Sequence, residues 1–284
     1  MSPMQREVRA EVAAYLGRSL GGRVGLDVWT RAESGLVLPD RDGCTHCDAV
    51  AESAREIATT HDAISLTRYD LDRHAARAEE AGIERAPTTV IRGGGRSLRF
   101  VGYWSGPLLA PLVTVLGLLG GGVRPLAEEG REALGALPEA VDVELAVTPF
   151  DPISPQLMLL LGAIAAEARD VNVTITEYAE FPKLAARRSV VELPTLWIGE
   201  RRYVGVWRDD ELIEQVARAA AGNVEPVIRE STLSVPYLSE EGARQLARQT
   251  RAEQGGDPGF PGVAPGTETS PGSGGSGLIV PGRG

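Results

Sequence analysis

The only two cysteines of this 284-residue chain are three positions apart, in the motif Cys44-Thr45-His46-Cys47. The motif follows a segment that predicts a buried strand and opens one that predicts a helix. Unpaired N–H groups and the helix macrodipole stabilise an anion at a helix N-terminus. Cys44 is therefore the candidate thiolate nucleophile. Cys47, one turn later, could attack a mixed disulfide and close the ring.

His46 stands between the two cysteines. A protonated imidazole there would add positive charge near Cys44 and lower the pKa of its thiol. A more stable thiolate makes the reduced form more stable and the couple more oxidising. We therefore expect a more oxidising couple than one without the histidine.

Two other interpretations of the cysteines are open. Zinc requires four ligands, and the chain offers the two cysteines with His46, His61 and His74, which lack zinc-finger spacing. The cysteines could also be an incidental buried pair. Redox chemistry explains their place between strand and helix best, and we expect neither a metal nor an organic cofactor.

Composition limits the partners and the compartment. The chain has 29 Lys and Arg against 39 Asp and Glu, a net charge of −10. This balance argues against binding to nucleic acid or to an anionic membrane surface. The most apolar stretch, Pro107 to Gly120, is too short to span a bilayer, and the N-terminus lacks the apolar run of a signal peptide. We expect a cytoplasmic protein.

Strand and helix patterns alternate along the chain and then repeat. PTTVIRGGGRSLRFVGYW, residues 87–104, matches PTLWIGERRYVGVW, residues 194–207. Cys47 precedes Pro87 by 40 residues, and Ser154 precedes Pro194 by the same distance. Such a repeat indicates two copies of one α/β unit. Strands are predicted at 23–30, 63–69, 88–91, 98–103, 141–147, 171–178, 195–198 and 202–206, and helices at 4–18, 44–59, 71–82, after 106, and at 126–137, 154–168, 181–188 and 209–221.

The repeat predicts five segments. They are a first domain at 1–122 with the CxxC motif, a linking helix at 123–139, a second domain at 140–224, a helical or irregular extension at 225–254, and a Gly- and Pro-rich tail at 255–284. The second domain has Asp151-Pro152-Ile153-Ser154 in place of CxxC. It has no thiol, so we expect a structural role for it.

The chain resembles the protein disulfide oxidoreductases, in which two thioredoxin-fold, glutaredoxin-like units are fused. The resemblance covers about residues 5–222 and rests on the leading helix, GCTHCDAV, YDLD, ERAPTT and VGYW. It implies two tandem thioredoxin-like domains, each a central mixed β-sheet flanked by helices. It also implies exchange with protein disulfides and dithiols, and recycling by a thioredoxin-reductase-like electron donor or acceptor.

The resemblance implies roles for residues outside the motif. Pro87 and Pro194 would follow cis peptide bonds, and the backbone of Ala86 would pair with the substrate strand. Thr45 and Thr88 would join Ala86 and Pro87 in contacting substrate. In thioredoxins a buried acid near the position of Asp27 moves protons from the resolving cysteine, although Asp27 could equally be an edge residue. A competing hypothesis is a non-catalytic thioredoxin-fold adaptor or chaperone that binds a protein partner.

The tail at 255–284 has 11 Gly and 5 Pro in 30 residues. Such a composition predicts disorder, because little apolar area can be buried. Its end, LIVPGRG, places Leu278, Ile279 and Val280 on this tether. The arrangement resembles the targeting peptides of encapsulin cargo proteins, which implies docking to an encapsulin shell; the alternative is an inert terminus.

Overall fold

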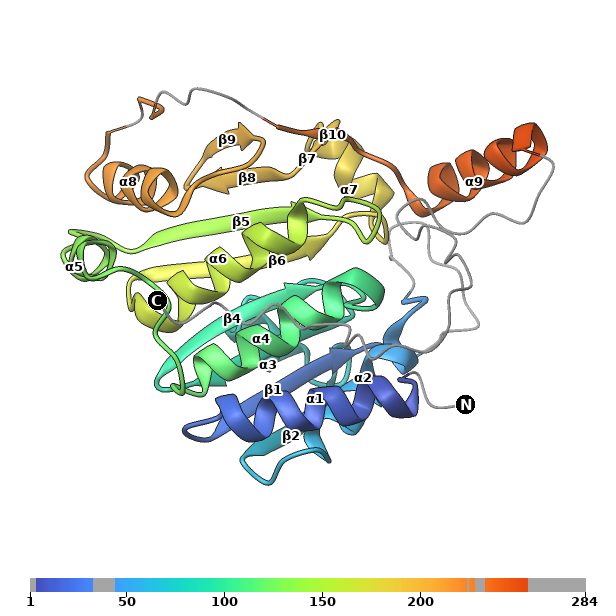
Figure 1. Cartoon of the computed structure of the whole chain (residues 1–284), viewed down its shortest axis with the longest axis horizontal. Coiled ribbons are helices and arrows are strands. Elements are labelled where there is room, and N and C mark those ends of the chain that lie inside the picture. Colours follow the sequence, from blue (N-terminus) through green and yellow to red (C-terminus); the bar gives the residue numbers. More distant parts are fainter. Residues whose placement is uncertain (1–3, 33–43, 224, 228–232, 255–284) are drawn as a thin grey trace, which may run out of the picture. The chain divides into compact units, whose positions relative to one another are not determined.

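An eight-stranded mixed sheet runs through the protein (Figure 1). The computed structural model describes residues 4–32, 44–223, 225–227 and 233–254. One compact unit extends to Tyr237 and contains the sheet, and a second begins at Leu238. The strands are β1 (Val24–Thr30), β2 (Ile64–Asp70), β3 (Thr88–Gly93), β4 (Arg96–Val101), β5 (Val141–Val147), β6 (Val171–Glu177), β8 (Thr195–Ile198) and β9 (Arg201–Val204).

The strand order β2-β1-β3-β4-β6-β5-β8-β9 contains one pattern twice. In the first half, β1 pairs parallel with β2 and antiparallel with β3, which pairs antiparallel with β4. In the second half, β5, β6, β8 and β9 repeat these relations. The halves join where β4 pairs parallel with β6, from Leu98 opposite Val173 to Val101 opposite Thr176. The sequence predicted the two units but not their shared sheet.

Helices cover the sheet because their apolar residues recur at helical spacing. In Figure 1, α4 and α6 lie side by side over the sheet, one from each half. Gly162 of α6 permits this approach, since a Cβ there would collide with Cγ2 of Val115 in α4. The helices of the first unit are α1 (Arg6–Ser19), α2 (Cys47–Ala58), α3 (Ala75–Glu80), α4 (Leu109–Leu119), α5 (Glu128–Gly135), α6 (Ser154–Glu167), α7 (Pro182–Arg187) and α8 (Asp209–Ala220), with a 3₁₀ turn, η1 (Gly106–Leu108).

Burial explains the most apolar segment. Every residue of α4 from Pro111 to Leu119 is buried, because α4 packs on the sheet and also contacts its neighbours α1 and α6. Fully burying one aliphatic side chain of this size contributes about 2 kcal/mol. None of the described helices combines the length and apolar character needed to cross a lipid bilayer.

The mixed α/β fold is confirmed, with helices flanking a central mixed sheet. The helix after the CxxC motif starts at Cys47, three residues later than predicted. Two short strands were missed, β7 (Glu192–Leu193) and β10 (Val235–Pro236), which pair antiparallel. In the second unit, α9 (Glu240–Gln254) lies within the expected extension. The domain boundaries stay a prediction, and the tail at 255–284 lies outside the described residues.

Candidate active site

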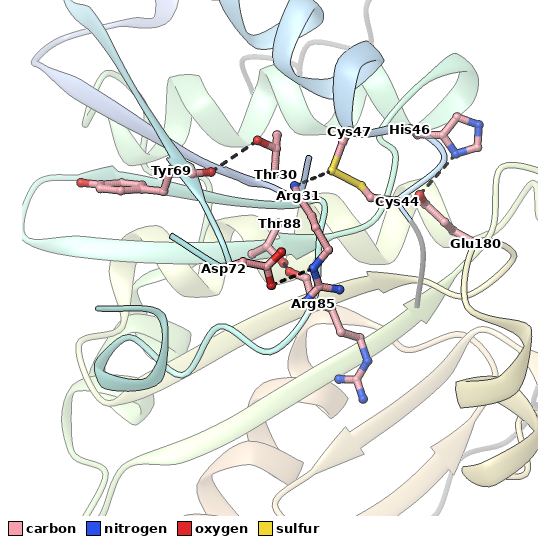
Figure 2. The surroundings of a disulfide bond; sticks show 10 residues. All are labelled: Thr30, Arg31, Cys44, His46, Cys47, Tyr69, Asp72, Arg85, Thr88 and Glu180. Atoms are coloured by element: carbon pink, nitrogen blue, oxygen red, sulfur yellow. Dashed lines mark hydrogen bonds and ion pairs between the residues drawn. A yellow bond between two sulfur atoms is a disulfide. The ribbon is translucent and has the colours of Figure 1, made fainter. Parts of the chain in front are cut away.

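Cys44 and Cys47 form a disulfide (Figure 2), with an S–S distance of 2.02 Å and a Cα–Cα distance of 5.4 Å. Cys47 is the first residue of α2 and is 4% exposed, whereas Cys44 lies in the preceding turn and is partly exposed. The buried face of α2, which includes Val50, Ala54 and Ile57, anchors the helix on the sheet. The two sulfurs therefore differ in access, and the more accessible one belongs to Cys44.

A backbone donor faces the inner sulfur. The N–H of Arg31, just after β1, donates to Sγ of Cys47 at 3.0 Å (Figure 2). The Arg31 side chain turns to Asp72, with Nε 3.3 Å from Oδ1. A donor to sulfur favours its charged form, as does the N-terminus of α2. Negative charge on Cys47 is therefore stabilised when the disulfide opens.

A cis proline lies beside the disulfide. The peptide bonds Ala86–Pro87 and Leu193–Pro194 are both cis, in agreement with the expectation from the resemblance. Ala86 belongs to the buried cluster of Cys47, against which Cys44 also packs. Within the described part of the chain, neither backbone N–H nor C=O of Ala86 is hydrogen-bonded. Its polar groups are therefore available to another strand.

The two expected threonines differ in exposure. Thr45 is exposed in the turn between the cysteines. Thr88 is only 1% exposed, and its hydroxyl donates to the carbonyl of Arg85 at 2.7 Å. Thr195 donates in the same way to Glu192 at 2.6 Å in the second half. The Thr88 hydroxyl thus fixes the cis-proline turn, as its counterpart does in the other repeat.

His46 is held by residues that the sequence analysis did not single out. Its Nδ1 lies 3.3 Å from Oε1 of Glu180, and its ring stacks on Tyr103 with centroids 4.7 Å apart (Figure 2 shows the contact with Glu180). Glu180 follows β6 and so comes from the second half. A positive charge on His46 is therefore paired with a carboxylate. The sequence alone indicated no such partner for His46.

A second buried carboxylate adjoins this pair. Glu177, the last residue of β6, accepts the N–H groups of Ala179 at 2.8 Å and of Glu180 at 3.1 Å. Burial raises the pKa of Glu177 to about 8, assisted by the charge of Glu180 and opposed by the two N–H donors and by His46. Glu177 and Glu180 are far from the motif in the sequence, with 134 positions between His46 and Glu180, and no local sequence pattern marks them. They therefore could not be singled out from the sequence.

Asp27 is buried on β1, at 8% exposure, and pairs with a basic residue. Its Oδ2 lies 2.6 Å from Nη2 of Arg92 on the neighbouring strand β3. No contact described for Asp27 reaches either cysteine. Its Oδ1 is buried without a hydrogen-bond partner among the described residues. The proton-transfer role suggested by the resemblance stays a prediction.

The corresponding turn of the second half is closed by its own side chains. Asp151 is 2% exposed and Ser154 is fully buried. Asp151 accepts the N–H of Ile153 at 2.8 Å and of Ser154 at 3.2 Å, and the Ser154 hydroxyl also donates to it. Asp151 thus satisfies the first N–H groups of α6. The arrangement supports the structural role expected for this motif.

The remaining histidines make local contacts. Nδ1 of His61 lies 3.1 Å from the N–H of Ala63, and Nδ1 of His74 lies 3.1 Å from the N–H of Asp70. Leu278, Ile279 and Val280, the expected docking residues, lie outside the described residues.

A polar cavity of about 640 Å³ opens on the sheet between the halves. Arg85 and Thr88, which flank the cis-proline dipeptide, line one part of it. Residues of β4, β5 and β6 also line it, together with residues 82–84 and Arg188, which follows α7. The cavity therefore extends from the cis-proline turn into the second half.

No protein-family model and no curated protein matches the chain. A protein disulfide oxidoreductase from Aeropyrum pernix is similar in structure, with a TM-score of 0.67 and 22% identity, over 78% of this chain and 95% of that one. The alkylhydroperoxide reductase component AhpF from Enterococcus faecalis has a TM-score of 0.65 and 21% identity, over 75% of this chain and 99% of that one. A separate structure of the NTD_N/C domain of AhpF gives the same values. The likeness establishes the fold: two tandem thioredoxin-like halves.

Proposed function

We propose that the protein is a thiol–disulfide oxidoreductase that exchanges protein disulfides through Cys44 and Cys47. The observation that carries the proposal is the disulfide at the start of α2, packed against the cis-proline turn, with Cys44 the more accessible sulfur. The fold, shared with a protein disulfide oxidoreductase, supports the same conclusion.

In the reducing direction, the Cys44 thiolate attacks a sulfur of the substrate disulfide. The S–S bond of the substrate breaks, one substrate thiolate leaves and takes a proton, and Cys44 is held in a mixed disulfide. The Cys47 thiolate then attacks Sγ of Cys44 and releases the second substrate thiol. Two electrons and two protons pass to the substrate, and the Cys44–Cys47 disulfide forms.

In the oxidising direction, a substrate thiolate attacks Sγ of Cys44. Cys47 leaves as a thiolate and keeps the electron pair of the broken S–S bond. The N–H of Arg31 and the N-terminus of α2 stabilise that leaving group. A second substrate thiolate then attacks the mixed disulfide and releases Cys44. The same groups serve both directions, and the redox partner decides which one prevails.

The substrate chain would lie beside the cis-proline turn. The backbone N–H and C=O of Ala86, which have no partner among the described residues, would pair with it as with a neighbouring strand. Thr45 is exposed next to the reacting sulfur. The cavity beyond Arg85 could accept an extended polypeptide segment on the other side of the turn. Pro87 and the Thr88 hydroxyl would keep the turn in place.

Other partners remain predictions from the sequence. A thioredoxin-reductase-like protein would recycle the cysteines, and an encapsulin shell would bind the terminal LIVPGRG segment. Fusing residues 277–284 to a fluorescent protein tests the second idea. Co-purification of the fusion with a shell protein from the source organism is expected, and a fusion that stays separate from the shell would reject it.

Insulin reduction with dithiothreitol tests the proposed reaction. Wild-type protein should accelerate the precipitation of the insulin B chain, and Cys44→Ser should abolish the acceleration. Full activity of Cys44→Ser would refute the nucleophile assignment. The adaptor hypothesis predicts the opposite pattern: no activity in the wild type, and equal binding of a partner by wild type and by Cys44→Ser/Cys47→Ser.

A further inference from the structure

The side chain of His46 contacts two residues that are far away in the sequence. Tyr103, just after β4, stacks on one face of the ring with an interplanar angle of 12°. Glu180, from the second half, places Oε1 3.3 Å from Nδ1. The imidazole is about one quarter exposed, and the Glu180 side chain is 7% exposed. We infer that Glu180 is a positioning residue that holds the imidazole of His46 in place and in its charged form, so that the second half completes the redox site of the first.

The backbone at Gly102 is shaped for this contact. Gly102 has a φ of +105°, and a Cβ there would lie 2.8 Å from Cβ of Glu177 and 3.3 Å from Oε2 of Glu180. Its N–H donates to the carbonyl of Pro87 at 2.8 Å. The same glycine thus supports the cis-proline turn and leaves room for the two acids. The segment that carries Glu177 and Glu180 therefore packs directly against the CxxC half at Gly102.

The charge balance of the cluster also favours the inference. A buried carboxylate requires a positive partner or a proton, and Oε2 of Glu180 is buried with no hydrogen-bond partner in the described structure. Oε1 faces Nδ1 of His46, whose N–H donates a hydrogen bond to it when the ring is charged. An opposite charge at this distance favours the charged imidazole.

Other titratable groups lie near the pair. Glu177 stays largely protonated at neutral pH, because burial raises its pKa to about 8. Tyr237, the last residue of the first unit, interacts with Glu177. Burial and the charge of Glu177 raise the pKa of Tyr237 to about 12, so it is neutral too. Tyr103 presents its ring face to His46. Among the described residues, Glu180 is the acid whose carboxylate oxygen directly contacts the imidazole.

The inference rests on the proposed function, because a fixed charge on His46 affects catalysis only if the neighbouring cysteines exchange disulfides. If the imidazole keeps its proton across neutral pH, the charge of the His46–Glu180 pair stays constant between about pH 5.5 and 7.5. The Cys44 thiol would then react without an inflection caused by His46. Without Glu180, His46 would lose its proton within this range. The electrostatic potential at the Cys44 thiol would then change with pH.

Histidine NMR on the oxidised protein tests this without requiring any redox activity. The chain has three histidines, so each imidazole signal can be followed and assigned with His46→Phe, which keeps a ring against Tyr103. We expect the His46 pKa to fall by about one unit or more in Glu180→Gln. Glu167→Gln is the matched control: Glu167 is also a carboxylate of the second half, 5% exposed and paired with Arg131 at 3.8 Å. It should leave the His46 titration unchanged.

Alkylation of the reduced protein by iodoacetamide supplies a second readout. The rate of Cys44 modification in Glu180→Gln should gain an inflection at the lowered His46 pKa, and His46→Phe/Glu180→Gln should lack it. A His46 titration that is the same in wild type and Glu180→Gln would overturn the inference, whatever the insulin assay shows. A wild-type protein that fails to reduce insulin, while Glu180→Gln still lowers the His46 pKa, would reject the proposed function and leave the inference standing.

Discussion

The backbone N–H of Arg31 lies 3.0 Å from the sulfur of Cys47, which links the end of β1 to the first residue of α2. The contact gives the inner sulfur a hydrogen-bond donor, while Cys44 has the more accessible position. The two cysteines are therefore assigned different steps by their surroundings. A buried thiol next to a fixed donor suits the resolving step, and an accessible one suits the attack on substrate.

This asymmetry predicts which single-cysteine variant traps substrate. Cys47→Ser should accumulate a mixed disulfide with a disulfide-containing protein, because the attack by Cys44 proceeds and the resolving thiol is missing. Cys44→Ser should accumulate little of it, since Cys47 is 4% exposed. Non-reducing electrophoresis followed by mass spectrometry measures both adducts. Equal trapping by the two variants would contradict the assignment.

The pair of Asp27 and Arg92 predicts a stability role for the acid. Asp27→Asn removes an ion pair whose arginine is half exposed, so the expected loss is only about 1 kcal/mol in the free energy of unfolding. We expect the rate of the resolving step, followed by rapid-quench trapping of the mixed disulfide, to stay within about twofold of wild type. A tenfold slower second step with an unchanged first step would instead establish that Asp27 moves protons for Cys47.

Glu177 predicts a pH-dependent loss of stability. A glutamate in the unfolded chain titrates near 4.3, whereas burial raises the pKa of Glu177 to about 8. Between these values the folded protein holds a proton that the unfolded chain has released, so this group makes stability fall as pH rises from about 4.3 to 8. Glu177→Gln should remove that fall, a difference of a few kcal/mol between pH 5 and 9.

Urea unfolding of the oxidised protein at pH 5, 7 and 9 measures this difference. The slope of the unfolding free energy against pH is compared between the two proteins, rather than single values. This removes the constant cost of replacing one carboxyl oxygen with an amide NH2 group. A wild-type slope that matches the Glu177→Gln slope would show that Glu177 ionises normally in the folded protein.

The close contact of α4 and α6 predicts a steric cost. In Gly162→Ala the new Cβ would collide with Cγ2 of Val115, which is fully buried, so we expect a loss of about 1–3 kcal/mol. Gly17→Ala in α1 is the control, because nothing lies within 4 Å of a Cβ there. The control should be neutral or up to about 1 kcal/mol more stable. If both variants unfold at the same urea concentration, the contact between the halves is looser than described.

Much of the fold was predictable because it depends on local patterns that occur twice. The strands at 141–147 and 195–198 were predicted at their observed bounds. The helix after the motif was predicted three residues too early, since a CxxC turn carries no cue that separates it from the first turn of its helix. The strands β7 and β10 have two residues each, too few for a periodic signal.

The junction between the halves could not be predicted. The pairing of β4 with β6 joins two strand edges that have no characteristic sequence, so the shared sheet depends on tertiary packing alone. The same junction places Glu180 beside His46, although 134 positions separate them in the chain. The CxxC motif was predictable from its residues, and the cis proline at Pro87 only from the family resemblance. The acids that adjoin it required the structure, and so did Arg92 opposite Asp27.

The most direct test of the account is the reduction potential of the Cys44–Cys47 couple. Equilibration with glutathione buffers, acid quenching and mass measurement of alkylated thiols give the fraction oxidised. We predict a single two-electron transition at a potential less negative than the value of about −270 mV for thioredoxin. A pair that stays fully oxidised or fully reduced across the whole glutathione range, without any equilibrium with it, would contradict the claim that these sulfurs exchange disulfides.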